Sequence, residues 1–233
     1  MHYAWLIWSL ILLGFWLAVY FALKNKESKR EMLIISFWTS LFGFLEPLFV
    51  PEYWNPPSLF DLAQNTGFDL ESFIFSFGVG GLVVVLYEKI FPVEHVSFSQ
   101  QEKDMPRHKY HTFAILVGPA AFALLWAFSG MNPIYYSFIA LMAGGSALLY
   151  CRPDLKQKMV VSAFIFMGFY FIYFFTLLAM FPGYVEAVWN FAVISGKVFF
   201  GVPLEELMFA FGFGFAWSGI YEHFRWYKLS AIK

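Results

Sequence analysis

Long apolar stretches alternate with short polar segments along the whole chain. A helix needs about 20 predominantly apolar residues to cross the hydrocarbon core of a bilayer, and seven stretches meet this requirement. The predicted spans are residues 3–23, 32–50, 70–90, 112–128, 133–150, 159–181 and 202–224. The pattern therefore predicts an all-α membrane protein, in which seven transmembrane helices form a single membrane domain over residues 1–233.

The distribution of basic residues predicts the orientation of these spans. Lys and Arg concentrate after the first, third and fifth spans and in the C-terminal tail, whereas the alternate connections hold only Lys197. Basic loops stay on the cytoplasmic side of a membrane. The N-terminus is therefore predicted outside and the C-terminus inside, which requires an odd number of spans. The first apolar stretch is long enough to span and ends in a basic loop, so we expect no separate signal peptide.

The third and seventh spans are similar to each other, which indicates an internal repeat. Residues 69–78 align with residues 203–212 at an offset of 134. The matched residues include Glu71 with Glu205, Phe75 with Phe209, Gly80 with Gly214 and, one position out of phase, Trp54-Asn55 with Trp189-Asn190. We therefore predict two parallel three-helix repeats, over residues 1–91 and 133–224, joined by a linker helix over residues 112–129. A site is expected at the interface between the copies.

Composition narrows the class of protein. Hydrophobic residues make up 60% of the chain and charged residues 13%, against about 45–50% and about 25% in soluble domains. A multi-pass protein of the cell membrane is expected, without a large soluble catalytic domain. The net charge of -1 provides no basic surface for nucleic acid.

The sequence predicts neither a metal nor a cofactor. The single cysteine, Cys151, excludes a disulfide framework and a thiolate metal cluster. The five histidines lie at termini and in loops, so we expect no metal held by histidine. The glycine-rich segments lie within apolar spans, where glycine permits close helix packing rather than nucleotide binding.

Carboxyl groups are the ionisable groups that the span interiors hold, and such groups are functional candidates because their burial in a membrane is expensive. Glu205 and Glu206 follow Pro203 and so lie in the first turn of the seventh span. They are candidate proton donors, or else two acids that complement the helix dipole. The copy at Glu71, which opens the matching helix, favours a function for all three as catalytic residues.

Other residues have weaker claims to a function. Glu46 precedes Pro47 without a partner in the other repeat, and Glu88 and Glu222 are expected to pair with Lys89 and Arg225 at the cytoplasmic face. Since no basic residue is expected inside the spans, the buried acids need partners from the backbone, hydroxyls, Trp or Asn, or a bound cation. Aromatic anchoring at the membrane surface would explain either Trp-Asn pair alone, but their repetition in phase with the acids places them in the same predicted cavity. The predicted substrate-binding residues are Trp54, Asn55, Phe75, Trp189, Asn190 and Phe209.

The segment Pro203-Leu204-Glu205-Glu206, with Trp189-Asn190 before it and Tyr221-Glu222 after it, resembles the integral-membrane lycopene cyclases, in their fused form. The hallmark of that family is Pro-x-Glu-(Glu/Asp) at the start of a membrane helix in each half. The resemblance covers nearly the whole chain. The first copy departs from the motif, because it reads Asp69-Leu70-Glu71-Ser72. Either this half is inactive and only Glu205 and Glu206 act, or Glu71 serves in the opposite role, or the chain carries out another carotenoid reaction, such as hydration or isomerisation.

The resemblance implies redox-neutral, acid-catalysed closure of β-rings at the ends of lycopene through a carbocation, without a cofactor. The expected partners are a lipophilic polyene such as lycopene and membrane lipid, with homo-oligomerisation left open. Aromatic ring faces suit a polyene or a carbocation. Two other classes of membrane protein share features of this plan. A small proton-coupled transporter shares the three-plus-one-plus-three plan, whereas a retinal photoreceptor needs a lysine in the seventh span, which has none from residue 202 to residue 224.

Overall fold

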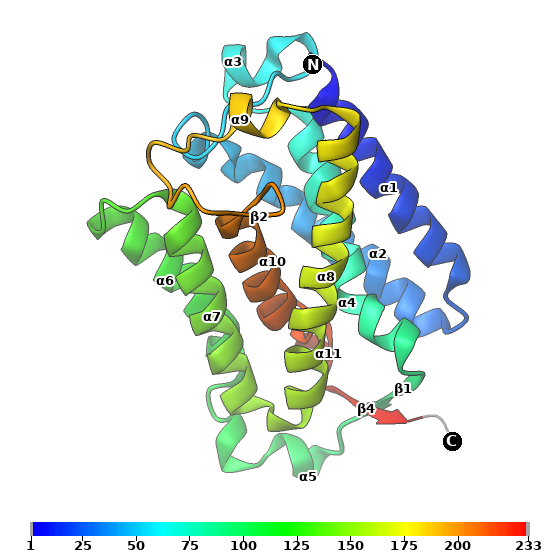
Figure 1. The fold of residues 1–233 in the computed structure, drawn as a ribbon. Helices are drawn as coiled ribbons and strands as arrows, with labels where there is room; N and C mark the ends of the chain where they lie inside the picture. The colour runs from blue at the N-terminus through cyan, green and yellow to red at the C-terminus, as the bar shows by residue number, and fades with distance from the viewer. Residues whose placement is uncertain (1, 232–233) are drawn as a thin grey trace.

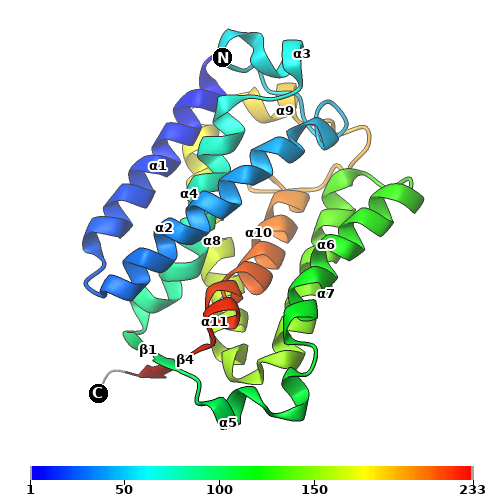
Figure 2. The same ribbon diagram turned by 180° about the vertical axis from the view of Figure 1, so that it is seen from behind.

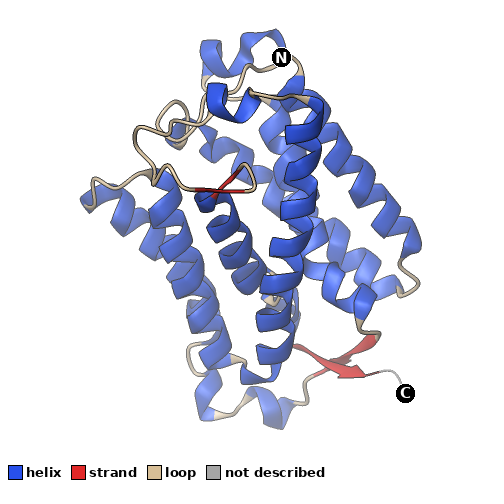
Figure 3. Ribbon diagram, viewed as in Figure 1, coloured by secondary structure: helices blue, strands red, loops and turns tan. Residues whose placement is uncertain are grey.

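The computed structural model describes residues 2–231, and most of them are helical (Figures 1 and 3). Six helical segments are long and apolar enough to cross a membrane. They are α1 (Ala4–Ala22), α2 (Lys26–Ser40) continued by the 3-10 helix η1 (Leu41–Leu48), α4 (Leu70–Ile90), α6 (His111–Phe128), α7 (Pro133–Cys151), and η4 (Pro153–Leu155) continued by α8 (Lys156–Met180). The chain is therefore an all-α protein of the multi-pass membrane type.

The seventh predicted span is not one continuous helix. It consists of α10 (Leu204–Trp217) and the short α11 (Ile220–Arg225), which are separated at Ser218 and Gly219. The 14 residues of α10 give a length of about 21 Å at 1.5 Å per residue, which is less than the roughly 30 Å of the hydrocarbon core. The count of seven spans therefore stays a prediction.

The two termini lie at opposite ends of the bundle (Figure 1). We call the end that holds the N-terminus the outer end and the opposite end the inner end, after the predicted orientation. Short elements complete the chain: η2 (Leu59–Asp61), α3 (Leu62–Thr66) and α9 (Tyr184–Val188) between long helices, and α5 (Gln100–Lys103) and η3 (Pro106–His108) before α6. At the inner end, β1 (Val93–Ser97) pairs antiparallel with β4 (Tyr227–Ala231), and near the outer end β2 (Val198–Phe199) pairs with β3 (Val202–Pro203).

The long helices pack in corresponding pairs. In the first predicted repeat α4 packs against α1 and α2, and in the second α10 packs against α7 and α8. Contacts between α4 and α8 join the two halves, and α6 packs along α7. Figure 2 shows α1 and α2 on one side of the bundle, α6 and α7 on the other, and α10 between them.

Two glycines at matching positions allow this close packing. A Cβ atom added at Gly80 of α4 would lie 2.4 Å from the Thr39 side chain of α2, and one at Gly214 of α10 would lie 2.8 Å from the backbone of Ala163 in α8. These distances leave no room for a side chain. The interpretation of these glycines as packing positions is confirmed. A helix that has glycine at the point of contact can approach its neighbour more closely, because glycine has no Cβ atom.

Candidate functional site

A largely apolar cavity of about 430 Å³ lies between the two predicted repeats. In the first half, residues of α1, η1, the outer loop after η1, and α4 line the cavity. In the second half, residues of α7, α8 and α10 line it, and α6 closes one side. Two carboxyl side chains line this cavity, Glu46 from η1 and Glu206 from α10. Both are buried, so the cavity combines apolar walls with two acids.

Three hydrogen-bond donors surround the carboxyl group of Glu206. Its Oε1 atom accepts from the Tyr53 hydroxyl at 2.6 Å and from the Trp189 indole at 2.9 Å. Its Oε2 atom accepts from the Tyr170 hydroxyl at 2.7 Å. Donors at such distances stabilise the carboxylate form strongly in a site without water. Hydroxyls and an indole are among the partners that the sequence predicted for a buried acid.

Each of these partners comes from a different element. Glu206 lies in the first turn of α10, Tyr170 in the middle of α8, Tyr53 in the loop after η1, and Trp189 directly after α9. Burial raises the pKa of the Tyr53 phenol far above its ordinary value, and the nearby Glu206 carboxylate raises it further. Tyr53 therefore keeps its proton and acts as a donor to Glu206.

Glu46 lies on the first-repeat side of the cavity without such donors. Its Oε1 atom is buried and has no hydrogen-bond partner within residues 2–231. Ser72, which the repeat alignment pairs with Glu206, also lines the cavity, and its hydroxyl is buried without a partner in the part of the chain that the structure describes. Nearby, Asp69 caps α4 by accepting a hydrogen bond from the backbone of Ser72 at 2.5 Å. Burial raises the pKa of Asp69.

Glu71 and Glu205 are buried but do not line the cavity. Each instead accepts a hydrogen bond from a backbone N–H of the outer loop that precedes its own helix, Glu71 from Leu59 at 2.8 Å and Glu205 from Ser195 at 2.9 Å. Glu205 accepts a second bond from the Tyr135 hydroxyl at 2.7 Å. Of the three acids predicted as catalytic, the structure therefore places only Glu206 at the cavity, and the other two hold loops at equivalent positions.

The repeated Trp-Asn pairs meet each other across the outer end. The backbone N–H of Asn55 donates to the carbonyl of Val188 at 2.9 Å, and the backbone N–H of Asn190 donates to the carbonyl of Tyr53, also at 2.9 Å. The rings of Trp54 and Trp189 lie 5.3 Å apart, and both line the cavity. Neither asparagine side chain lines it. The asparagine positions thus join the loops by their backbone, while the tryptophans provide cavity wall.

Phe75 and Phe209, the matched aromatic residues of α4 and α10, both line the cavity. They flank Tyr170 at ring-centroid distances of 6.3 Å and 6.2 Å. The side chain that contacts Glu206 is therefore enclosed by one phenylalanine from each predicted repeat.

Four residues of this site were not among the predicted site residues: Tyr53, Tyr170, Ser72 and Glu46. Tyr53 and Tyr170 carry a weak signal, because one adjoins Trp54 and the other is a polar group in the middle of a predicted span. Glu46 was considered as a buried acid but had no partner in the other repeat. Its position at the cavity depends on η1, whose course cannot be read from apolarity.

Contacts at the inner end of the bundle show that two predictions about charged side chains are wrong. Glu88 and Glu222 do not pair with Lys89 and Arg225. Both accept hydrogen bonds from Lys158, with an Nζ–Oε1 distance of 2.9 Å to Glu88. Lys158 is buried in α8, so a basic side chain does lie within a helix that can span the membrane. The predicted loop between the fifth and sixth spans ended at residue 158 and therefore extended too far.

Two further side chains complete this buried ionic cluster, which we define as Glu31, Glu88, His95, Lys158 and Glu222. Lys158 Nζ lies 3.1 Å from Glu31 Oε1. His95 Nε2 lies 3.2 to 3.4 Å from oxygens of all three carboxyls. These carboxyls raise the pKa of His95 to about 12, against the opposing effect of burial.

Comparison with known proteins gives one match. The family model of lycopene cyclases matches residues 132–224. This part, less than half of the chain, is therefore similar to the lycopene cyclase family. The matched region runs from the residue before α7 to α11 and contains Trp189, Glu205 and Glu206. Neither the curated proteins nor the solved structures gave a significant match. The lycopene cyclase domain supports an enzyme of carotenoid cyclisation and does not favour the transporter alternative.

Proposed function

We propose that this protein closes β-type rings at the ends of a linear carotene such as lycopene, by acid–base catalysis without net oxidation. One observation carries the proposal: within the lycopene cyclase domain, Glu206 faces an apolar, aromatic cavity and is held there by three donors. A lipophilic polyene can enter such a cavity from the membrane, and we propose the cell membrane as its location.

Glu206 is the acid in this proposal. Its proton adds to the terminal carbon–carbon double bond of the polyene, which leaves a tertiary carbocation. The next double bond attacks this cation and closes a six-membered ring, and loss of a proton from the ring then gives the product. Protonation of an alkene needs an acid with a stable conjugate base, and the donors from Tyr53, Tyr170 and Trp189 stabilise the carboxylate that Glu206 becomes.

Glu46 is the base in this proposal, because it is the other carboxyl group that lines the cavity. It takes up the proton that the ring loses, and proton exchange between the two carboxyls before the next turnover restores the starting state. The reaction is then an isomerisation that consumes neither a proton nor an oxidant. Glu71 and Glu205 act indirectly, by holding the outer loops that carry Tyr53 and Trp189.

Aromatic walls stabilise the intermediate. Trp5, Trp54 and Trp189 lie at the outer part of the cavity, with ring centroids 4.7 Å apart for Trp5 and Trp54. Ring faces attract a cation by about 0.5–2 kcal/mol each, and more strongly where water is excluded. Aromatic walls also offer no nucleophile that would trap the carbocation as an alcohol.

Expression in a lycopene-accumulating host tests the proposal. The pigments are extracted and separated by chromatography, and the chain is expected to yield ring-bearing carotenes. Loss of a general acid lowers a rate by about 10²–10⁴-fold, so Glu206→Gln is expected to lower ring formation by at least about 100-fold, and Glu46→Gln comparably. Glu186→Gln serves as the control, because Glu186 is an exposed acid of α9.

A second variant tests the hydrogen bond that Tyr170 donates to Glu206, and leaves the acid itself in place. A hydrogen bond to a charged group is worth about 1.5–3 kcal/mol, so Tyr170→Phe is expected to slow ring formation by roughly 10- to 100-fold while the protein stays in the membrane. If the wild-type chain, present in the membrane, forms no cyclic carotenoid, or if Glu206→Gln cyclises at the wild-type rate, the proposal is wrong.

A further inference from the structure

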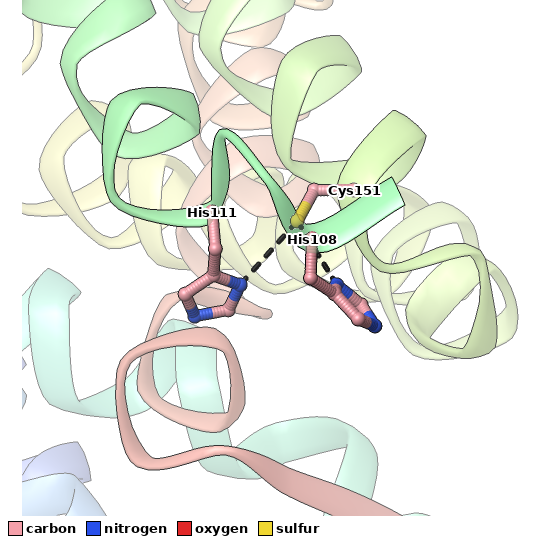
Figure 4. Close-up of side chains that lie close together, drawn as sticks. All are labelled: His108, His111 and Cys151. Carbon is pink, nitrogen blue, oxygen red and sulfur yellow. Dashed lines mark hydrogen bonds between the residues drawn. The ribbon is translucent and has the colours of Figure 1, made fainter. Parts of the chain in front are cut away.

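Two histidines and the single cysteine come together at the inner end, far along the bundle from the carboxyls of the cavity. His108 ends η3, His111 begins α6 and Cys151 ends α7. All three are buried, and Figure 4 shows the two histidine rings close to the Cys151 sulfur. The sequence placed these histidines in a loop and predicted no metal site, because 40 residues separate His111 from Cys151 and apolarity does not report which loop ends meet.

The ligand atoms have the spacing of a shared coordination sphere. The Nδ1 atoms of His108 and His111 lie 3.4 Å and 3.3 Å from the Cys151 sulfur, and the three ligand atoms lie within 4.8 Å of one another. For a tetrahedral ion with bonds of about 2.0–2.1 Å to nitrogen and about 2.3 Å to sulfur, nitrogen and sulfur ligands are roughly 3.5 Å apart. A small inward or outward adjustment of these side chains therefore suffices for binding.

A neighbouring backbone carbonyl fixes the tautomer of His111, and this tautomer can bind a metal ion through Nδ1. The Nε2 atom of His111 lies 3.0 Å from the backbone carbonyl oxygen of His223. A carbonyl only accepts hydrogen bonds, so this nitrogen carries the proton, and the lone pair is on Nδ1, which faces Cys151. An imidazole that donates to a carbonyl from one nitrogen and binds metal through the other is the common arrangement in protein metal sites.

The same three side chains can also contact one another through hydrogen bonds alone. The single thiol proton of Cys151 can satisfy the lone pair of His111, and His108 must then donate to the sulfur from Nδ1. That tautomer leaves a lone pair on His108 Nε2, which is buried and has no partner among residues 2–231. A metal ion would instead engage Nδ1 of both rings and the sulfur at once, and His108 Nε2 would then carry a proton.

Two neighbouring side chains, Trp226 and Arg152, border this cluster. Trp226 stacks on His111 at a centroid distance of 3.5 Å and covers one side. Arg152 is already paired with Asp154 at 2.7 Å and does not depend on Cys151 as its counter-ion.

We propose that His108, His111 and Cys151 bind one thiophilic d¹⁰ metal ion, Zn²⁺ in the first instance. Two imidazoles and one thiolate suit this class of ion, and the fourth position is open to water. The ion would join the loop before α6 to the inner end of α7. This role is structural and does not depend on the proposed cyclisation.

Metal content of the purified protein tests this site. The full chain is purified in detergent with an affinity tag that contains no histidine, stripped with a chelator, dialysed against buffered Zn²⁺ and measured by elemental mass spectrometry. The wild type is expected to hold about one Zn²⁺ per chain. Cys151→Ser and His111→Gln are each expected to weaken binding by at least about tenfold, whereas His2→Gln, a change at an exposed histidine, leaves it unchanged.

Cobalt gives a direct signature of the ligands. With Co²⁺ in place of Zn²⁺, the wild type is expected to show a thiolate-to-cobalt charge-transfer band that Cys151→Ser lacks. Size-exclusion elution of each variant shows whether it is folded, and the cobalt spectrum of the wild type stands even if a variant misfolds. Absence of stoichiometric Zn²⁺ from the wild type, or a wild-type cobalt spectrum without the thiolate band, would overturn the proposal. Pigment analysis on the same preparations keeps this outcome separate from failure of the cyclase proposal.

Discussion

Buried carboxyl groups lie at both ends of this bundle, and their hydrogen-bond partners differ between the two ends. At the outer end Glu206 is held by neutral donors from two tyrosines and a tryptophan. At the inner end the carboxyls of the ionic cluster are held by Lys158 and His95. A carboxyl group beside neutral donors can exchange a proton within the reaction, whereas one paired with a cation remains charged. The outer acids therefore suit chemistry and the inner ones suit structure.

His95 makes the stability of the inner end depend on pH. Its pKa is about 12 in the folded protein, against about 6.5 in an unfolded chain. The cluster's contribution through His95 is therefore complete below about pH 6.5 and decreases as the pH rises toward about 12. The titratable groups that face it are the three cluster carboxyls, which also contact Lys158, and the tyrosines Tyr221 and Tyr227.

Thermal unfolding in detergent at pH 6 and pH 9 measures this effect. The wild type is expected to lose more of its Tm between these two pH values than His95→Gln, because only the wild type keeps a proton on His95 when folded that its unfolded chain releases above about pH 6.5. His2→Gln, at an exposed position, should follow the wild type. Equal losses of Tm in the wild type and His95→Gln would contradict the assignment of a charged His95.

For single residues, the sequence predicted which acids are buried better than it predicted the side chains that contact them. The charge-poor spans singled out Glu71, Glu205 and Glu206, and all three are buried. Their different surroundings could not be predicted, because Tyr53 reaches Glu206 across 153 positions of the chain. The doubled motif does not show that only one of these acids faces the cavity, since the repeat aligns Glu206 with Ser72 rather than with an acid.

At the scale of elements, apolar length predicted the long helices closely and their interruptions poorly. The predicted spans 70–90 and 133–150 correspond to α4 (Leu70–Ile90) and α7 (Pro133–Cys151). The break between α10 and α11 was not predicted, because Ser218 and Gly219 are small and do not interrupt an apolar pattern. For the same reason η1, which brings Glu46 to the cavity, appeared only as the end of a span.

Close approach of α10 to α8 gives a prediction about helix packing. A methyl group at Gly214 would lie 2.8 Å from the Cα atom of Ala163, and a backbone atom cannot move aside as a flexible side chain can. Gly214→Ala is expected to destabilise the protein by about 1–3 kcal/mol, the usual effect of overpacking. The measurement is the Tm in detergent together with the amount of protein in the membrane.

Gly168→Ala is the matched control for this prediction. Gly168 also lies inside a helix, α8, but a Cβ atom there would have no neighbour within 4 Å. Alanine is favoured over glycine in helices by up to about 1 kcal/mol, so this variant should be neutral or slightly stabilised. If both variants behave alike, close packing at Gly214 is not what limits the helix distance.

At the scale of the whole molecule, the two halves are joined by matching contacts. Asn55 and Asn190, aligned by the repeat, each donate from the backbone to the opposite loop, and Glu71 and Glu205 each anchor the loop before their own helix. Such reciprocal contacts are what two parallel copies related by an axis along the membrane normal would make. The repeat stays a prediction with which these contacts agree, and the cavity lies between its two predicted halves.

The orientation of this arrangement in the membrane is the last prediction. Basic loops predict that the outer end, with α3 and α9, faces away from the cytoplasm and that the inner end, with α5, faces the cytoplasm. Single cysteines are introduced at exposed loop positions, Asn65→Cys in α3 and Gln101→Cys in α5. The native Cys151 is buried and gives little background.

In intact cells a membrane-impermeant maleimide should label only the Asn65→Cys variant, and both variants should be labelled after permeabilisation. Labelling of Gln101→Cys alone in intact cells would mean that the orientation is the reverse of the predicted one. Labelling of both would mean that α4, the one long helix between the two positions, does not cross the membrane.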